Sequence, residues 1–258
     1  MTARVVVWAV PITVLLLAAN PLDTAPLRLD EELRHITRSI RAAEHRDAVR
    51  IVPWFAARPD DLVQGLLEHR PQVVHFSGHG SRAGEIRFVG DDGRSRAVTP
   101  EALRRVLGVL RDDVRVVLLN ACHSAAQAAV IKEQVDVTIG MSRAVGDRAA
   151  IAFAGAFYRA LAFDRSVQDA FELGVATLLL EGIPGEDVPQ LITRAGAPAS
   201  LHLVRDGDRP TATPQPWVQN ITSAAPGATA QGAMFGNVIN HPGEQTPDPA
   251  DKRDTGPR

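Results

Sequence analysis

Short apolar runs alternate along the chain with longer segments in which apolar residues recur every three or four positions. The short runs predict six β-strands, at residues 13–18, 50–54, 73–80, 114–120, 137–140 and 200–204. The longer segments predict a first helix that begins near residue 30, followed by helices at 59–68, 100–110, 125–133, 147–162 and 166–180. Strands and helices that alternate in this way are typical of an α/β fold, in which helices cover both faces of a mostly parallel sheet.

Residues 85–98 follow a different pattern, because polar and apolar side chains alternate on either side of the Gly-Asp-Asp-Gly segment at 90–93. Alternation around a Gly-rich turn predicts a β-hairpin. The hairpin comes directly after the third predicted strand, so we expect it to overhang the carboxyl end of that strand.

The composition of the chain changes near residue 206. Residues 206–258 contain eight prolines and six glycines, a content that predicts a disordered tail. With 45% hydrophobic residues, the rest of the chain can bury a core of its own. We therefore expect one domain at residues 1–205 and a flexible tail at 206–258.

Charge and cysteine content narrow the classes of partner and compartment. With 28 basic and 30 acidic residues, the formal net charge of −2 gives no electrostatic basis for binding nucleic acid or a membrane surface. A single cysteine cannot form a disulfide within the chain. A free thiol is more typical of proteins in the reducing cytoplasm, so we expect a cytoplasmic protein. Arg4 and the apolar residues 5–19 would also suit a targeting segment. We favour a buried strand, because Pro11 interrupts the run and the run is short for a membrane-spanning helix.

The third and fourth predicted strands end in residues that can carry chemistry. The third ends on His79, and the fourth leads into Cys122, the only cysteine. Sites in open α/β sheets form beyond the carboxyl ends of the strands, so adjacent strands would place both side chains in one crevice. An imidazole beside a thiol takes its proton and stabilises the thiolate. The pattern predicts a nucleophile and its base.

Ser-Gly-His-Gly at 77–80 and Asn-Ala-Cys-His-Ser at 120–124 resemble the histidine and cysteine motifs of the caspase-like cysteine peptidases. The histidine comes first and precedes the cysteine by 43 residues, against about 50 in caspases. Residues 15–32 resemble the opening of the bacterial CHAT family, relatives of caspases and separases, and the resemblance extends from about 13 to 204. It implies a caspase-like three-layer fold around a mostly parallel six-stranded sheet, and a cysteine endopeptidase that needs no cofactor. In the family pattern backbone N–H groups hold the oxyanion, here those of Gly80 and Cys122.

Substrate preference is less clearly encoded. Metacaspases, which select Lys or Arg, carry an acid two residues before the cysteine, where this chain has the neutral Asn120. A preference for a basic P1 residue would need another acid, and Asp23 and Asp147 are candidates on loops expected to border the site. Arg28 would instead favour an acidic P1 residue. The alternative for each charge is a solvated loop residue or a helix cap.

Two other site types remain open. His75 and His79 lie four apart on one predicted strand and would share a face, so with Cys122 they would suit zinc, although no further ligand cluster is evident. A nucleotide-binding module is disfavoured, because no Gly-rich phosphate-binding motif follows a strand.

Within the tail, residues 217–240 carry no charge and combine apolar residues with Asn and Gln, a composition that suits cross-β stacking. The segment resembles the short amyloid signalling motifs of some bacterial and fungal immune effectors. That resemblance implies an upstream sensor or adaptor protein as partner, and activation by recruitment in signalling or defence. Two alternatives are an unstructured tail without a role, and a catalytically inactive scaffold that assembles through this segment.

Overall fold

The computed structural model describes residues 11–110, 113–198 and 200–204. The predicted tail at 206–258, its segment 217–240 and Arg4 lie outside the described residues. The boundary between residues 205 and 206 therefore stays a prediction.

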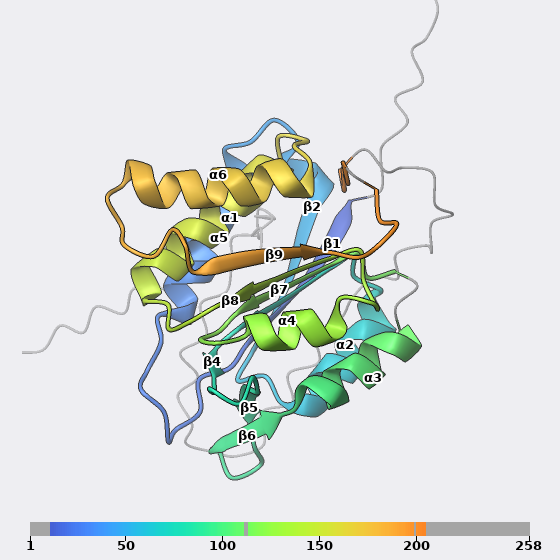
Figure 1. Ribbon diagram of the computed structural model, residues 1–258, viewed down its shortest axis with the longest axis vertical. Coiled ribbons are helices and arrows are strands. Elements are labelled where there is room, and N and C mark those ends of the chain that lie inside the picture. The colour runs from blue at the N-terminus through green and yellow to red at the C-terminus, as the bar shows by residue number, and fades with distance from the viewer. Residues whose placement is uncertain (1–10, 111–112, 199, 205–258) are drawn as a thin grey trace, which may run out of the picture. The chain divides into compact units, whose positions relative to one another are not determined.

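A six-stranded sheet forms the middle layer (Figure 1). Its order is β2-β1-β3-β7-β8-β9, and all neighbouring pairs are parallel except the antiparallel pair β8–β9. The strands are β1 (Ile12–Ala18), β2 (Val49–Phe55), β3 (Val73–Ser77), β7 (Val116–Asn120), β8 (Val137–Met141) and β9 (Pro189–Thr193). The predicted mostly parallel six-stranded sheet is confirmed.

The position predicted for the last strand is wrong. Residues 200–204 form no strand, although Leu201 and Leu203 are buried and the Leu201 carbonyl accepts a hydrogen bond from the Val167 N–H at 2.8 Å. The sixth strand is β9, a partly exposed edge strand with a mixed sequence. It runs antiparallel because two helices, rather than one, separate it from β8, so the chain reverses direction once more.

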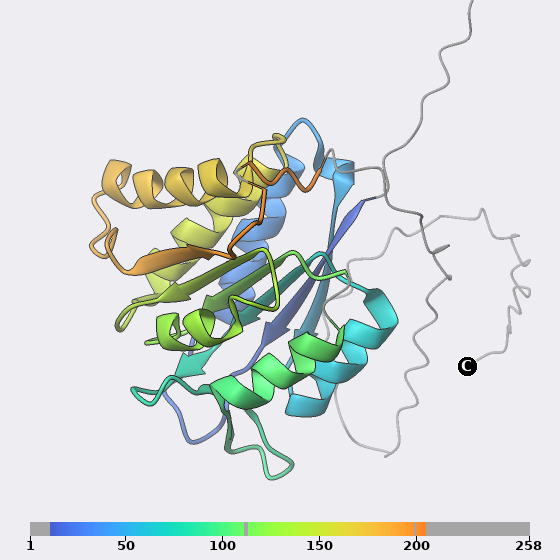
Figure 2. The ribbon, with the colours of Figure 1, turned by 45° about the vertical axis from the view of Figure 1, so that its right-hand side comes forward.

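Helices cover both faces of the sheet (Figures 1 and 2). One layer contains α1 (Leu29–Arg41), α5 (Asp147–Leu161) and α6 (Val167–Leu180). The other layer contains α2 (Pro59–His69), α3 (Pro100–Leu110) and α4 (Ala125–Ile131). A short 3₁₀ helix, η1 (Arg46–Ala48), precedes β2 in the chain. Each layer packs on its own core. Successive side chains of β1 supply the two cores alternately, Leu16 to one and Leu15 to the other. The sheet and its two helical layers form the predicted three-layer α/β arrangement.

The predicted apolar face of α1 is buried against α5. Leu29, Ile36 and Ile40 are buried, and the two helices approach so closely that a Cβ on Gly155 would lie 2.0 Å from the His35 ring. Glu32 lies on this buried face and is 3% exposed. An acid is thus enclosed where the pattern predicts only apolar contacts.

The hairpin predicted at 85–98 is confirmed as β5 (Ile86–Val89) and β6 (Ser95–Val98). A third short strand, β4 (His79–Gly80), pairs with β5, so the histidine belongs to this small antiparallel sheet and not to β3. The prediction that His75 and His79 share a face of one strand is therefore wrong. The chain leaves the main sheet at Gly78, where a Cβ would lie 2.8 Å from the Ala19 carbonyl oxygen.

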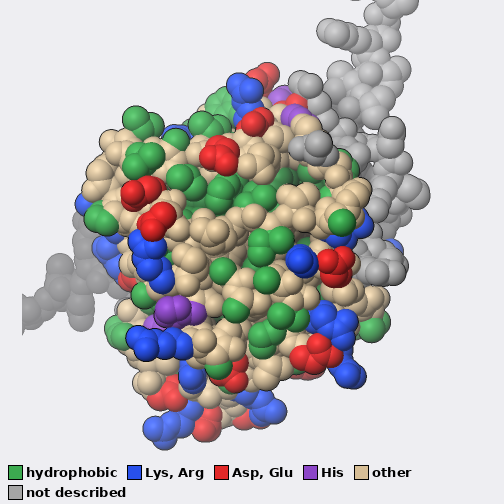
Figure 3. Space-filling view, in the orientation of Figure 1, with side chains coloured by type: hydrophobic (Ala, Val, Ile, Leu, Met, Phe, Trp, Pro, Cys, Tyr) green, Lys and Arg blue, Asp and Glu red, His purple; other side chains and the backbone are tan. Residues whose placement is uncertain are grey.

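The surface facing the viewer in Figure 3 mixes basic, acidic and hydrophobic side chains, with no extended region of one charge. Within the described residues, none of the helices has the length and apolar character needed to span a bilayer.

Candidate active site

His79 and Cys122 line the same small pocket, of about 40 Å³, beyond the carboxyl ends of β3 and β7. Both side chains are half-buried. Arg28, Asn120 and Asp147 also line this pocket. The structure thus brings together two residues that lie far apart in the sequence, at the edge where a parallel sheet forms sites.

The His79 ring is oriented by a backbone carbonyl. Its Nε2 atom lies 2.8 Å from the carbonyl oxygen of Ala25. A carbonyl oxygen only accepts hydrogen bonds, so Nε2 carries the ring proton and Nδ1 keeps a free lone pair. The imidazole is therefore prepared to act as a base through Nδ1.

The loop at residues 20–27, which carries Ala25, is closed by its own hydrogen bonds. The Asn20 side chain accepts from the Leu27 N–H and donates to the Leu27 carbonyl, both at 3.2 Å. The loop is also tied to the hairpin, because the Leu22 N–H donates to the Gly93 carbonyl at 3.0 Å. These contacts hold the carbonyl that orients His79.

Asp23 provides the second tie between this loop and the hairpin. Its carboxylate accepts hydrogen bonds from the Ser95 N–H at 2.7 Å and the Ser95 hydroxyl at 3.0 Å. Desolvation of the carboxylate raises the pKa of Asp23, but the hydrogen bonds from Ser95 outweigh it. The pKa of Asp23 is therefore held below its usual value. Asp23 is not among the residues that line the pocket of Cys122, so the structure places it as an anchor of the loop.

Cys122 lies on a tight turn after β7. The Ser124 N–H donates to the Ala121 carbonyl at 3.3 Å, and His123 has a φ of 59°, which is uncommon for a residue with a side chain. The buried Ser124 hydroxyl donates to the Leu119 carbonyl at 2.7 Å and accepts from the Met141 N–H at 2.9 Å. This turn leaves the thiol 4.0 Å from the Val145 carbonyl oxygen.

Gly80 packs directly against the backbone of Cys122. A Cβ at this position would lie 2.0 Å from the Cys122 carbonyl oxygen. The absence of a side chain therefore lets β4, and His79 with it, approach the cysteine turn. The two residues proposed to supply the oxyanion hole meet here, and the role of their N–H groups stays a prediction.

The other predicted substrate-binding residues have distinct surroundings. Asn120 is buried and donates from Nδ2 to Glu32 Oε1 at 2.6 Å. Arg28 is exposed and forms an ion pair with Glu31 at 2.7 Å. Asp147 is half-buried and begins α5. All three predicted substrate-binding residues border the pocket, and their roles toward a substrate stay predictions.

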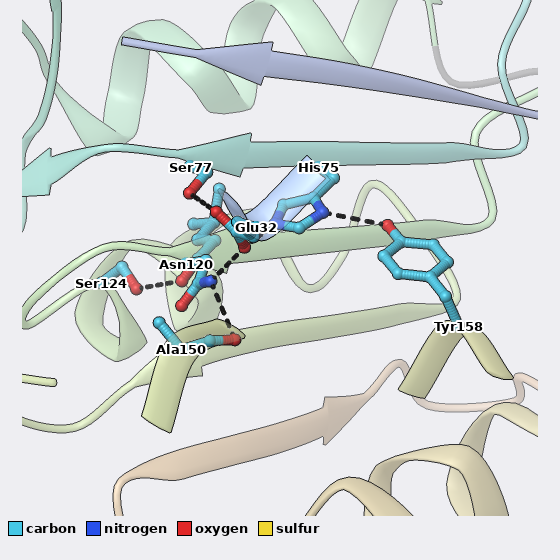
Figure 4. A network of polar contacts seen from close by, with 8 residues as sticks. Glu32, His75, Ser77, Asn120, Ser124, Ala150 and Tyr158 are labelled. Atoms are coloured by element: carbon cyan, nitrogen blue, oxygen red, sulfur yellow. Dashed lines mark hydrogen bonds and ion pairs between the residues drawn. The ribbon is translucent and has the colours of Figure 1, made fainter. Parts of the chain in front are cut away.

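Glu32 also lines the pocket and was not predicted as a site residue. Figure 4 shows it between Ser77, Asn120 and His75, with Tyr158 beyond the histidine. Burial, with the nearby Glu32 charge, raises the pKa of Tyr158 well above its usual value. The available sequence signal was an acid between Leu29 and Ile36 on an apolar helix face.

The zinc alternative does not match the observed geometry. His75 is fully buried and its Nδ1 lies 3.2 Å from the Tyr158 hydroxyl. Among the residues that the structure describes, no three His, Cys, Asp or Glu side chains are grouped so that they could hold a metal ion.

Comparison with known proteins identifies the family of the chain. Residues 9–179 match the family model described as CHAT domain. A protein of Gillisia limnaea named "Probable protease" is 24% identical over 152 residues, a match that covers 57% of this chain and 26% of that protein. A Roc-COR-CHAT protease from an unknown prokaryotic organism is 21% identical over 181 residues, which is 67% of this chain and 17% of that protein.

The chain thus spans only about a quarter of the length of the first relative and about a sixth of the length of the second. Among solved structures, the Arg specific cysteine proteinase gingipain R superposes with a TM-score of 0.50 at 10% identity, over 74% of this chain and 48% of that chain. At this identity the superposition shows a shared fold.

Proposed function

The chain belongs to the CHAT domain family, and we propose that it is a cysteine endopeptidase that cleaves protein substrates with His79 and Cys122. One observation carries the proposal: the half-buried thiol and imidazole line one pocket, and the Ala25 carbonyl leaves Nδ1 of the imidazole as the free basic nitrogen. The protease names of the two relatives support the reaction class.

The proposed reaction passes through an acyl-enzyme. Nδ1 of His79 takes the thiol proton, and the Cys122 thiolate attacks the scissile carbonyl carbon. Backbone N–H groups of Gly80 and Cys122 would stabilise the resulting oxyanion. The C–N bond then breaks as His79 protonates the leaving amine. Water, deprotonated by His79, attacks the thioester, which releases the acid and regenerates the thiol.

Substitution of the nucleophile tests this function. Cys122→Ala should abolish cleavage and leave the melting temperature nearly unchanged, because a half-buried residue on a turn loses little packing. His79→Ala should lower the rate at which iodoacetamide alkylates Cys122 at pH 7, and a chelator should have no effect on cleavage. Cleavage that survives in Cys122→Ala would refute the proposal.

Activation by recruitment in a bacterial signalling or defence system is the finer part of the proposal. Its support is the composition of residues 217–240, with the upstream sensor or adaptor as the partner. Deletion of residues 217–240 should remove the response to the partner and retain basal alkylation of Cys122. A specific activity that does not rise with protein concentration or forced dimerisation would contradict this mode of activation.

A further inference from the structure

The two strands that lead to His79 and Cys122 are joined by one buried carboxylate. Glu32 Oε2 accepts a hydrogen bond from the Ser77 hydroxyl, and Glu32 Oε1 accepts one from Asn120 Nδ2 at 2.6 Å. Ser77 lies two residues before His79, and Asn120 lies two residues before Cys122. Each oxygen of Glu32 therefore holds the end of a different strand (Figure 4).

The strand ends are already neighbours through their backbones. Ser77 is the register partner of Asn120, and the Gly78 N–H donates to the Asn120 carbonyl at 3.2 Å. Backbone pairing of β3 with β7 sets their separation, but it does not fix the side chains or the directions in which the two chains leave the sheet. After Ser77 the chain continues into β4, whereas after Asn120 it continues into the turn that carries Cys122. The hydrogen bonds to Glu32 therefore link the two segments at the point where they separate.

Glu32 also contacts a buried histidine, His75. His75 Nε2 lies 3.4 Å from Glu32 Oε1, and the His75 ring stacks on Tyr158 with the ring centroids 5.6 Å apart. All of these side chains are buried, with Glu32 3% and His75 0% exposed. The Glu32 carboxylate satisfies the buried Ser77 hydroxyl and the buried Asn120 amide N–H group, and buried hydrogen bonds of this kind restrict side chains to one arrangement. The carboxylate thus has a defined position relative to both strand ends.

We infer that Glu32 is a positioning residue, which aligns His79 with Cys122 by holding Ser77 and Asn120 with its two carboxylate oxygens. The inference rests on the proposed His-Cys function. It assigns Glu32 no contact with a substrate and no share in proton transfer. Its consequence is that the activation of Cys122 by His79 depends on Glu32.

A double-mutant cycle measures this dependence. The readout is the second-order rate of alkylation of Cys122, the only cysteine, by iodoacetamide at pH 7 in the full chain. A thiol with an ordinary pKa of about 8.5 is about 3% ionised at this pH, so complete activation raises the rate by at most about 30-fold. His79→Ala in the otherwise unchanged chain should therefore lower the rate by about 10- to 30-fold.

We call the ratio of the alkylation rate with His79 to the rate with alanine at this position the His79 factor. The expected result is that the His79 factor falls to about 2 or less when it is measured in the Glu32→Ala background. Glu32→Gln should keep most of the factor, because its amide oxygen can accept from Asn120 Nδ2 while its amide N–H group donates to the Ser77 hydroxyl. Ser77→Ala removes one of the two hydrogen bonds to Glu32, so it should give an intermediate factor, and it covers the case in which Glu32→Ala does not fold. The matched control Glu44→Gln, at an exposed glutamate beyond α1, should keep the full factor.

General destabilisation does not mimic this result, because the factor compares variants with and without His79 in the same background and is measured on folded protein. A full His79 factor in folded Glu32→Ala, or in Ser77→Ala where Glu32→Ala does not fold, would overturn the inference and leave the proposed function intact. Absence of any His79 factor in the otherwise unchanged chain would overturn the His-Cys function, and the inference with it.

Discussion

Replacement of Gly80 by alanine is expected to disable the site while leaving the domain folded. The new Cβ would lie 2.0 Å from the Cys122 carbonyl oxygen and 3.0 Å from the carbonyl carbon. Such contacts are essentially never closer than 3.0 Å, so the two backbones must separate by about 1 Å. Both partners are backbone atoms, and no side-chain rotation can relieve the overlap.

This separation moves the base away from the nucleophile, because Gly80 follows His79 directly and its contact is with Cys122 itself. Misplacement of reacting groups by about 1 Å costs on the order of 10²-fold in rate, or about 2.7 kcal/mol of transition-state stabilisation. The assay is the second-order rate of inactivation by a peptidyl acyloxymethyl ketone, with mass spectrometry of the labelled Cys122. The variant should lose about 10²-fold in this rate.

Gly108→Ala is the matched control. Gly108 lies within α3, where a new Cβ would meet only the end of the flexible Gln134 side chain at 3.0 Å. Alanine favours a helix interior over glycine by about 0.5–1 kcal/mol, so this variant should keep its inactivation rate and melt at the same or a higher temperature. A folded Gly80→Ala protein with an inactivation rate within threefold of the unchanged chain would refute the argument.

Three further predictions concern the surrounding structure. The lowered pKa of Asp23 means that its contribution to stability is complete above the unfolded pKa of about 3.8 and is lost as pH falls through the lower folded value. Asp23→Asn should therefore flatten the acid limb of thermal melts recorded between about pH 2 and pH 5. Asp136→Ala removes a buried carboxylate that binds two arginines and should lower the free energy of unfolding by about 2 to 3 kcal/mol in urea titrations. Ser166→Ala removes the cap that accepts from the Asp169 N–H at 3.1 Å and should cost about 1 kcal/mol in the same titrations.

Most of the fold follows from local patterns. The strands β1, β3, β7 and β8 are mostly apolar runs buried on both faces, and such runs are strong signals. The strand β9 was missed, since an edge strand that is half exposed needs no apolar run. A strand was wrongly predicted at 200–204 because Leu201 and Leu203 are apolar. Their side chains are buried in the core, and burial requires apolar side chains in any backbone conformation.

The site was predicted in part for a similar reason. Two motifs that end neighbouring parallel strands predict that His79 and Cys122 meet, because parallel strands place their carboxyl ends at one edge. Glu32 was missed because an acid in the first turn of a helix is normally a solvated partner of the helix dipole. Its two neighbours in the chain, Asp30 and Glu31, show no such burial.

The sequence by itself thus determined most of the elements, the edge of the sheet at which chemistry is possible and the two residues that meet there. Only the tertiary structure decided how the pair is held. The Ala25 carbonyl that orients His79 lies 54 residues before it, and Glu32 lies 45 residues from Ser77 and 88 from Asn120. Periodicity and turn chemistry report on neighbours within a few positions, whereas these contacts arise when separate elements pack against one another.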